Sequence, residues 1–452
     1  MNINKDWEKI KYHFKKTGFV FPSSEIYGGL ANAYDYGPLG ILLINNIKNL
    51  WWQEFITKEP KNYGIDAKVL LNPLVWKASG HLKNFIDPLV ENKVNNKRYR
   101  ADHVIEQFDS TLNASTMSNK EIEKFLKINV KQYDGSKTNW GEVKNFNLMF
   151  ETYQGIVEGH KNQIYLRPEL AQGIFINYKN VMDAMRTKIP FGIGQIGKSF
   201  RNEVTPRNFI FRTREFEQME LEYFVKPSDD ETAFNYYETK LKEFLKLVGI
   251  LDSSIRFRLH QENELAHYAK KTVDVEFDFP FGWGEIIGLA NRGDYDLKAH
   301  SERTNFLYKD PYNGEVFIPY VIEPSIGVDR LCLAILFDAY TNEKIGDKER
   351  VVMRIDPKVA PYKIAVLPLL KQQHQQKSQE IFNFLIQQNI SVTYDESGSI
   401  GKRYRRQDEI GTPWCITIDD QTLKTDKVTL RHRDTMEQIT IKYVDFFKHL
   451  KF

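Results

Sequence analysis

The sequence predicts an α+β fold in two parts, and three observations lead to this expectation. Residues 194–224 hold two segments with strand-like alternation on either side of a polar loop, Thr205 to Thr213, which indicates an antiparallel pair. Prolines flank a change of pattern near residues 355–361. Beyond them, strand-like and helix-like segments alternate, which is typical of a small α/β domain with a mostly parallel sheet. We therefore expect one domain over residues 1–357 and a second over residues 361–452.

Composition is that of an ordinary globular chain: 452 residues, 41% hydrophobic and 27% charged. The net charge of only +3 does not indicate a nucleic-acid binder, so any RNA contact must come from local patches. Cys332 and Cys415 lack the spacing of a zinc site or a disulfide framework, and we expect no zinc. The longest apolar run, Leu331 to Phe337, is too short to cross a bilayer, and the N-terminal residues have no signal-peptide core. We expect a cytoplasmic protein without a membrane partner.

The predicted antiparallel pair gathers polar side chains on one surface. In its second strand, alternation puts Met219 and Leu221 on an apolar face and sends Phe216, Gln218, Glu220 and Glu222 the other way. In its first strand, Arg201 and Glu203 share a face. A solvated hairpin and the wall of a pocket both fit this pattern.

The residues FRNE, a loop, and then REFxQxE resemble motif 2 of class II aminoacyl-tRNA synthetases, in the form found in the bacterial-type homodimeric glycyl-tRNA synthetases. That resemblance implies a catalytic domain built on a mixed, mostly antiparallel sheet with helices, rather than a Rossmann fold. No P-loop or GxGxxG motif occurs in the chain, which agrees.

Two further stretches extend the resemblance toward the N-terminus. YDYGPLG is followed by Ile41, Ile44, Ile47, Trp51 and Phe55 at helical spacing, which predicts an amphipathic helix. Simple packing on the core explains such a helix, but together with YDYGPLG it resembles motif 1, which implies a homodimer. SGH and RADH also match the glycine-specific family, which implies that Arg100 reaches the substrate pocket, with a surface salt bridge as the alternative. Residues 106–145 are polar, hold a helical piece near 120–127, and resemble an insertion without chemistry.

RPELAQGIF predicts the start of a helix, where Pro168 fits the first turn and Glu169 complements the positive end. The stretch resembles the family's RPE-x-AQGIF, which implies that Glu169 contacts the substrate amino group. Leu170 stands where threonine is more usual, and it is not the ligand.

Farther along, a helix over 229–249 and strands over 255–259 and 273–279 are predicted. Glu285 lies in an apolar strand and needs a partner, for which Arg292 would suffice. The resemblance instead implies a role for Glu285 as a Mg²⁺ ligand beside phosphate.

EPSIGVDR leads from a strand into a helix that is apolar on nearly every side and therefore buried. Arg330 sits in the first turn, where the helix dipole disfavours a cation, so a bound polyphosphate or a buried ion pair is expected. The stretch resembles motif 3, so all three class II motifs occur in order.

After residue 361 the predicted order is strand 363–367, helix 378–388, strand 391–394, helix 402–410, and strands 414–418 and 427–431. This part resembles the anticodon-binding domain of class IIa synthetases. A basic cluster suited to tRNA phosphates and base stacking, or else a solvated helix face, comprises Lys402, Arg403, Tyr404, Arg405 and Arg406.

Taken together, the resemblance implies a glycine–tRNA ligase whose partners are glycine, ATP, Mg²⁺ and tRNA(Gly). It implies that Arg201 and Arg330 are catalytic, with Arg201 bridging carboxylate and α-phosphate. The implied ATP-binding residues are Arg201, Asn202, Glu203, Phe211, Arg212, Phe216, Glu285, Ile286, Gly327 and Arg330. The implied glycine-binding residues are Arg100, Glu169, Phe216, Gln218, Glu220, Glu323 and Ser325.

Two alternatives to this interpretation are a class II synthetase for another amino acid and a non-catalytic relative such as the accessory subunit of mitochondrial DNA polymerase. Retention of Arg201, Glu203 and Glu220 argues against the second, since a pure binding module has no use for them.

Overall fold

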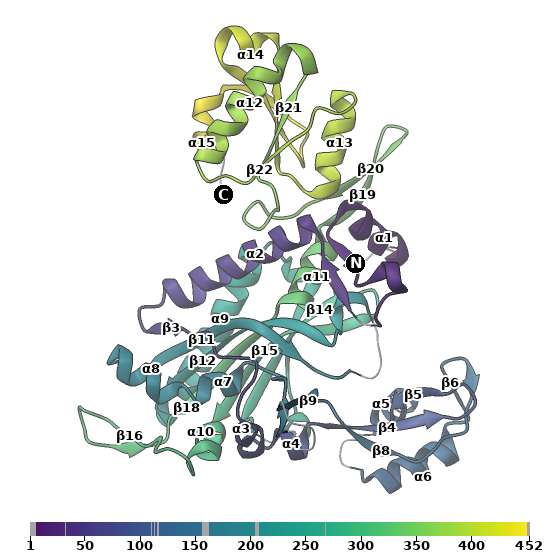
Figure 1. Ribbon diagram of the computed structural model, residues 1–452, viewed down its shortest axis with the longest axis vertical. Coiled ribbons are helices and arrows are strands. Elements are labelled where there is room, and N and C mark those ends of the chain that lie inside the picture. Colours follow the sequence, from purple (N-terminus) through teal and green to yellow (C-terminus); the bar gives the residue numbers. More distant parts are fainter. Residues whose placement is uncertain are drawn as a thin grey trace.

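A seven-stranded sheet organises most of the chain in the computed structural model, which describes residues 6–449 except 32, 110, 113, 115–116, 156–161, 204–207 and 267. Its order is β13-β14-β15-β18-β12-β11-β3, and every neighbouring pair is antiparallel except β11 with β3 (Figure 1). The predicted mixed, mostly antiparallel sheet is therefore confirmed. The strands are β3 (Asn62–Gly64), β11 (Phe191–Phe200), β12 (Glu215–Val225), β13 (Ile255–Leu259), β14 (Lys271–Phe279), β15 (Gly282–Gly293) and β18 (Tyr320–Gly327).

Alternation along β12 separates a core face from a polar face, as the sequence predicts. Met219 and Leu221 are fully buried in the main hydrophobic core. Helices α9 (Asp230–Leu247) and α11 (Val328–Ala339) contribute their apolar residues to the same core. Residues 216, 218, 220 and 222 point to the opposite face of the sheet.

The N-terminal part packs along one end of this core and is tied to it by a buried carboxylate. It comprises α1 (Trp7–Thr17), β1 (Val20–Pro22), β2 (Tyr34–Tyr36) and α2 (Pro38–Trp52), the last continuing into a short π-helical turn over Gln53–Thr57. Asp329 in α11 accepts hydrogen bonds from the Tyr36 hydroxyl at 2.5 Å and from the Glu217 amide at 2.7 Å. Three segments distant in sequence therefore meet at one side chain. The expected apolar stripe of α2 includes Ile41, but the structure leaves this side chain exposed.

The polar face of the sheet is flanked by short helices and hairpins. The helices are α3 (Pro73–Ala78), α4 (His81–Asn84), α7 (Ala171–Phe175), α8 (Tyr178–Met185) and α10 (Tyr295–His300). The hairpin strands are β9 (Glu151–Gln154), β10 (Asn162–Tyr165), β16 (Tyr308–Lys309) and β17 (Val316–Phe317). A further hairpin, β19 (Tyr340–Ile345) and β20 (Lys348–Met353), follows α11 and lies beside the C-terminal part (Figure 1). Phe175 and Tyr178 pack with Phe191 and Phe224 in a second apolar cluster, which closes one end of this face.

A separate lobe projects from the main body (Figure 1). It contains β4 (Ile86–Asn92), β5 (Lys97–Arg100), α5 (Ala101–Phe108), α6 (Asn119–Asn129), β6 (Gln132–Tyr133), β7 (Ser136–Lys137) and β8 (Lys144–Asn147). Its own core includes Val90, Tyr99, Val104, Leu126 and Trp140. The expected insertion over 106–145 is shorter than the lobe that the structure shows, because the sheet on which α5 and α6 pack begins at Ile86.

The C-terminal part is a five-stranded sheet of order β22-β21-β23-β24-β25 with helices. Its elements are β21 (Ile364–Pro368), α12 (Lys371–Gln387), β22 (Val392–Tyr394), α13 (Ile400–Ile410), β23 (Trp414–Ile418), α14 (Asp420–Thr425), β24 (Lys427–His432), β25 (Gln438–Lys442) and α15 (Phe446–His449). The expectation of a mostly parallel sheet is wrong, since β24 and β25 are antiparallel. The helix expected from residue 378 begins earlier, at Lys371. Its first two turns are polar and carry no hydrophobic periodicity, so the sequence pattern did not reveal them.

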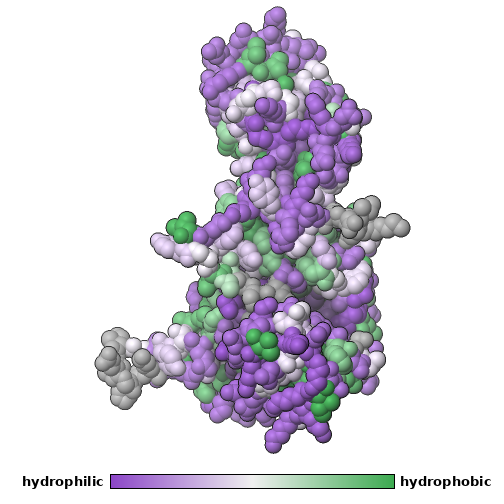
Figure 2. Space-filling model, turned by 90° about the vertical axis from the view of Figure 1, so that its right-hand side faces the viewer, coloured by the Kyte–Doolittle hydropathy of each residue, from purple (hydrophilic) through white to green (hydrophobic). Residues whose placement is uncertain are grey.

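Buried charges join the C-terminal part to the main body, where the molecule narrows in the side view (Figure 2). Arg350 of β20 is fully buried and donates from Nε to Asp408 of α13 at 2.9 Å. Asp408 also accepts two hydrogen bonds from Arg431. Arg433 donates to the carbonyl oxygens of Ile355 and Gly411 at 2.8 Å each. Across the described residues, no helix combines the length and the apolar character needed to cross a membrane.

Gly40 tests the packing of α2. A methyl group at this position would come within 2.0 Å of the carbonyl oxygen of Phe19. We expect Gly40→Ala to lower the free energy of unfolding by about 1–3 kcal/mol through overpacking, outweighing the gain of about 1 kcal/mol in helix propensity. Thermal denaturation measures the effect, with the exposed Asn45→Ala in the same helix as control. A Gly40→Ala protein as stable as the parent would contradict this packing.

Candidate active site

A cavity of about 370 Å³ opens on the polar face of the sheet, and strands β12, β15 and β18 supply much of its wall. Strand register explains why polar residues meet there: Glu220 pairs with Ser325, and Gly288 pairs with Ser325 from the other side. The sequence-predicted residues that line it are Glu169, Arg201, Glu203, Phe211, Arg212, Phe216, Gln218, Glu220, Glu285, Ile286, Glu323, Ser325, Gly327 and Arg330. Arg100 and Asn202 do not line it.

Glu220 is the centre of an acidic end of the cavity. Its carboxylate accepts hydrogen bonds from Ser325 Oγ at 2.8 Å, from Gln218 Nε2 at 2.5 Å and from the Leu170 amide at 3.0 Å. Burial raises the pKa of Glu220 to about 8, and the neighbouring carboxylates of Glu323 and Glu169 add to the rise. Without a ligand this group therefore holds a proton near neutral pH.

Arg292 is the cation of the acidic end and is only 2% exposed. It binds both oxygens of Asp296, at 2.6 and 2.9 Å, and donates to Glu323 at 2.9 Å. Its guanidinium also lies 3.9 Å from the ring centroid of Tyr268. The alternative pairing of Arg292 with Glu285 is wrong, because Asp296 takes Nε and Nη2 of the guanidinium and Glu323 takes Nη1.

Glu169 lies next to Glu220 but in a different electrostatic setting. Burial opposes its ionisation, yet His81, Arg292 and the Gln172 side chain hold the pKa of Glu169 well below its usual range. Its oxygen lies 3.3 Å from His81 Nε2 and 3.1 Å from Gln172 Nε2. Ser79 Oγ lies 2.8 Å from the other ring nitrogen of His81 and so orients the imidazole. Two adjacent glutamates therefore differ in charge.

Arg201 marks the basic side of the cavity. Its guanidinium lies between the rings of Phe85 and Phe216, 5.4 and 5.2 Å from their centroids, and Nε donates to the Pro168 carbonyl at 3.1 Å. Within the described residues no carboxylate lies within ion-pair distance of Arg201. An unneutralised guanidinium on a cavity wall is suited to an anionic ligand.

The strand predicted through Arg201 and Glu203 ends at Phe200. The Arg201 amide still bonds to Arg214 across the hairpin, but the Asn202 amide bonds to the Leu148 carbonyl at 2.7 Å. The chain therefore leaves the sheet at Asn202, which explains why that side chain is absent from the cavity wall. Residues 204–207 of the predicted loop lie outside the described residues.

Two further arginines lie farther along the basic side. Arg212 is 3.8 Å from Glu203, and burial lowers the pKa of Arg212. Arg330 Nη1 lies 3.1 Å from Glu285 Oε2, and its guanidinium lies 4.5 Å from the Phe211 ring centroid. Glu285 is thus a half-exposed partner of Arg330 rather than a buried carboxylate, because the pairing of β14 with β15 skips Ile286 and leaves Glu285 at the rim.

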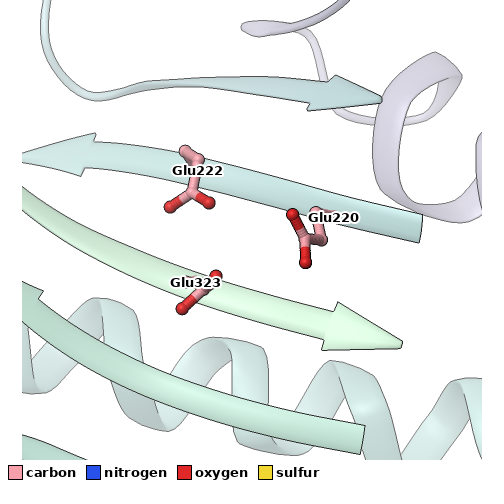
Figure 3. Close-up of side chains that lie close together, drawn as sticks. All are labelled: Glu220, Glu222 and Glu323. Carbon is pink, nitrogen blue, oxygen red and sulfur yellow. The ribbon is translucent and has the colours of Figure 1, made fainter. Parts of the chain in front are cut away.

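One pair of carboxylates, Glu285 and Asp274, is a candidate for holding a cation. Glu285 lies close enough to Asp274 that, after burial, its charge contributes to a raised pKa of Asp274. Both residues line the cavity, and oxygen donors of this kind suit Mg²⁺. Glu220, Glu222 and Glu323 also place one carboxylate oxygen each within 4.8 Å of one another (Figure 3), but both oxygens of Glu220 already accept hydrogen bonds.

Arg100 belongs to the lobe rather than to the cavity. It binds Asp102 at 2.5 Å and lies 3.3 Å from Asp87. Both carboxylates flank it in the same small sheet and helix, so its guanidinium is already occupied. These contacts fit the salt-bridge alternative, while the charge of Arg100 also acts on Arg212 of the cavity wall.

The predicted basic cluster of the C-terminal part is not one surface. Arg403 is buried and donates to the carbonyl oxygens of Pro368 and Gly398. Tyr404 lies beneath Arg431, and Arg406 is paired with Asp395. Helical spacing turns Arg403 inward, which leaves Lys402 exposed, Arg405 part-buried with its Nη1 enclosed, and Arg406 part-exposed but paired.

Sequence reasoning missed Arg292 as the binder of Glu323, the His81–Glu169 contact and the burial of Glu222. The Arg292–Asp296 pair had a signal, an arginine four residues before an aspartate at a strand-to-helix junction. The Arg292–Glu323 and His81–Glu169 contacts join segments far apart in sequence and carry no local signal.

Comparison with known proteins matches both parts of the chain. Residues 153–339 match the family model described as tRNA synthetase class II core domain (G, H, P, S and T), and residues 363–452 match the one described as anticodon binding domain. Glycine–tRNA ligase of Mycoplasmopsis synoviae (strain 53) is 55% identical over 456 residues, covering 100% of each chain. The enzyme of that name from Staphylococcus aureus (strain JH9) is 52% identical, covering 96% of each chain. Prolyl-tRNA synthetase of Giardia lamblia, solved in complex with prolyl-adenylate, superimposes with a TM-score of 0.65 at 15% identity, over 97% of this chain and 75% of that one, and shows the fold alone.

The raised pKa of Glu220 predicts a pH-dependent stability. The unfolded chain ionises near the ordinary value of 4.5, whereas the folded protein keeps the proton up to about 8. Between these values the folded state binds more protons, so rising pH reduces the free energy of unfolding by at most about 1.4 kcal/mol per pH unit. Glu220→Gln cannot ionise, so its thermal stability should gain on the parent from pH 5 to pH 8. The exposed Glu302→Gln should show no such trend, and parallel curves for Glu220→Gln and the parent would contradict the assignment.

Proposed function

The chain belongs to the glycine–tRNA ligase family, and from this premise we propose that it attaches glycine to tRNA(Gly) in two ATP-dependent steps. A carboxylate oxygen of glycine attacks the α-phosphorus of ATP, and the bond to pyrophosphate breaks, leaving glycyl-adenylate. The terminal ribose hydroxyl of the tRNA then attacks the glycyl carbonyl and AMP leaves. The enzyme needs no covalent nucleophile, so its residues act by positioning and charge stabilisation.

The observation that carries this proposal is the division of one cavity into an acidic and a basic side. Glu169, Glu220 and Glu323 gather at one end, and Arg201, Arg212 and Arg330 line the rest. A zwitterionic amino acid next to a polyphosphate has the complementary charges. This argues against a non-catalytic role, which would not need both sides. The identities with glycine–tRNA ligases argue against a different amino acid.

At the acidic end, the ammonium group of glycine would lie among Glu169, Glu220 and Glu323. An incoming ammonium favours the ionised form of Glu220, so binding would release the proton that this group holds. Ser325 and Gln218 fix Glu220 by hydrogen bonds, and Ser325 closes the space beside the glycine Cα. A rigid packed site of this kind excludes a larger amino acid by overpacking, without an editing domain.

At the basic side, Arg201 would bridge the glycine carboxylate and the α-phosphate, while Arg212 and Arg330 would hold the outer phosphates. Adenine would stack on Phe216, with Glu203 at its amino edge and Phe211, Ile286 and Gly327 completing the wall. Mg²⁺ would be held by Glu285, with Asp274 nearby, and supplies charge neutralisation on the phosphates when bound.

Assembly and tRNA binding are further parts of the proposal. We propose a catalytic domain over residues 1–357 and an anticodon-binding domain over 361–452. A cytoplasmic homodimer would bury the apolar residues that the N-terminal segment exposes, among them Ile26 and Tyr27, which are 88% and 86% exposed. Ile26 and Tyr27 are adjacent in the chain, and neighbouring exposed apolar side chains, unlike scattered ones, are suited to a protein interface.

Arg201→Ala in a glycine-dependent pyrophosphate-exchange assay tests the function. Loss of an electrostatic contact made in the transition state should lower the exchange rate by about 10²–10³-fold. The exposed Arg303→Ala is the matched control and should exchange at the parental rate. Absence of glycine-dependent exchange in the parent would remove the proposed function. Unimpaired exchange in Arg201→Ala would remove only this residue's role.

The double variant Lys402→Ala, Arg405→Ala tests the tRNA surface. Since each contact to phosphate releases counterions, we expect a several-fold rise in the Michaelis constant for tRNA and a flatter salt dependence of aminoacylation. Pyrophosphate exchange needs no tRNA and should be unchanged. Lys424→Ala, an exposed lysine on α14, is the control. If aminoacylation by the double variant equals that of the control, α13 does not contact tRNA.

A further inference from the structure

Glu222 is an ionisable residue at a fully buried position, where no ordinary structural role accounts for it. It lies two residues beyond Glu220 on β12, and its side chain is 0% exposed. Within the described part of the chain, neither of its carboxylate oxygens has a hydrogen-bond partner. Its side chain and those of Glu220 and Glu323 point toward the space between β12 and β18 (Figure 3). A buried, ionised and unpartnered carboxylate is too costly to persist, so a proton or a cation must be present.

The surrounding charges come from four elements. Glu220 lies on the same strand, Glu323 on β18, Arg292 on β15 and Asp296 on α10, while β11 presents the apolar Ile193 opposite Glu222. Arg292 is the cation of this group, and Asp296 and Glu323 already bind it. Among the residues that the structure describes, Glu222 therefore has no counter-ion of its own.

A proton fits these surroundings better than a metal ion. Magnesium and calcium complete their six or more oxygen ligands partly with water, whereas Glu222 of this three-carboxylate cluster is fully enclosed. Both oxygens of Glu220 already accept hydrogen bonds from Ser325, Gln218 and Leu170. Glu222 is also absent from the residues that line the cavity, so cavity water does not reach it. Burial, reinforced by the charge of Glu323, raises the pKa of Glu222 well above its usual range.

We propose that Glu222 is a protonated positioning residue whose carboxylic O–H donates to Glu323 and holds that carboxylate against Arg292, facing the ammonium subsite. The proposal rests on the glycine-binding role given to Glu323 above. In it, Glu222 sets the direction of Glu323 and, by staying neutral, limits the negative charge that faces Arg292 and one ammonium group. Burial raises the pKa of Glu323 as well, and the charge of Arg292 opposes that rise. Glu222 itself touches no substrate.

Glu222→Gln and Glu222→Leu separate a hydrogen-bond donor from simple packing. The glutamine amide donates as the protonated acid does, so Glu222→Gln should keep the Michaelis constant for glycine within about twofold of the parent at neutral pH. Leucine fills the space without donating. Glu222→Leu should raise the Michaelis constant for glycine about tenfold or more and leave the constant for ATP nearly unchanged. An equal effect on both constants, or a tenfold loss in Glu222→Gln, would overturn the proposal.

Infrared spectroscopy gives a readout that does not depend on activity. The parent should show the C=O band of a neutral carboxylic acid, shifted in D₂O, and Glu222→Gln should lose part of its intensity. An unchanged band would overturn the proposal, as would a stoichiometric divalent cation retained by the parent after dialysis against Mg²⁺ or Ca²⁺ and lost in Glu222→Gln. If Glu222→Leu does not fold, the glutamine variant and the spectrum still decide. If the parent lacks glycine-dependent exchange, the proposed function fails, and the spectrum still reports on the proton.

Discussion

The contact of Arg292 with Asp296 and Glu323 is the interaction on which the acidic end of the cavity depends. It lies in a fully enclosed setting, where desolvation of three charged groups is repaid only by close, well-directed hydrogen bonds. Without this guanidinium, the carboxylates of Glu323 and Asp296 would repel each other and the glutamates of β12. The fold provides this arginine at the end of β15, next to the helix that carries Asp296. Packing of Tyr268 on the guanidinium limits its movement further.

Charge in the cavity is graded rather than uniform. Glu169 is kept ionised by His81 and Arg292, whereas Glu220 on β12 is kept neutral by burial and by its acidic neighbours. A site with all its carboxylates ionised would bind stray cations and strain the folded state. A site with all of them neutral would not attract an ammonium group. Because only some of the carboxylates are protonated, the pocket is stable when empty and still attracts a cation.

Much of the fold could be predicted from the hydrophobic periodicity of the sequence and from its turn-forming residues. Strand alternation located β12 and β13, and the buried helix α11 was predicted from its continuous apolar surface. Contacts set by strand register could not be predicted in this way: Glu323 meets Glu222 only because β18 pairs with β12. Arg403 shows the same limit on a helix, since a run of basic residues reads as one surface until the fold turns one of them inward. The lobe was underestimated because its β4–β5 hairpin is polar and resembles a loop.

The Arg350–Asp408 contact has a consequence for how such a protein can be rearranged. The proline-flanked segment near residues 355–361 looks like a natural point for exchanging one C-terminal module for another. Yet the guanidinium that anchors the module lies upstream of that point, in β20, and its carboxylate lies downstream, in α13. A hybrid joined at the prolines would inherit one half of a buried ion pair from each parent. A functional exchange therefore has to carry the β19–β20 hairpin along with the module it supports.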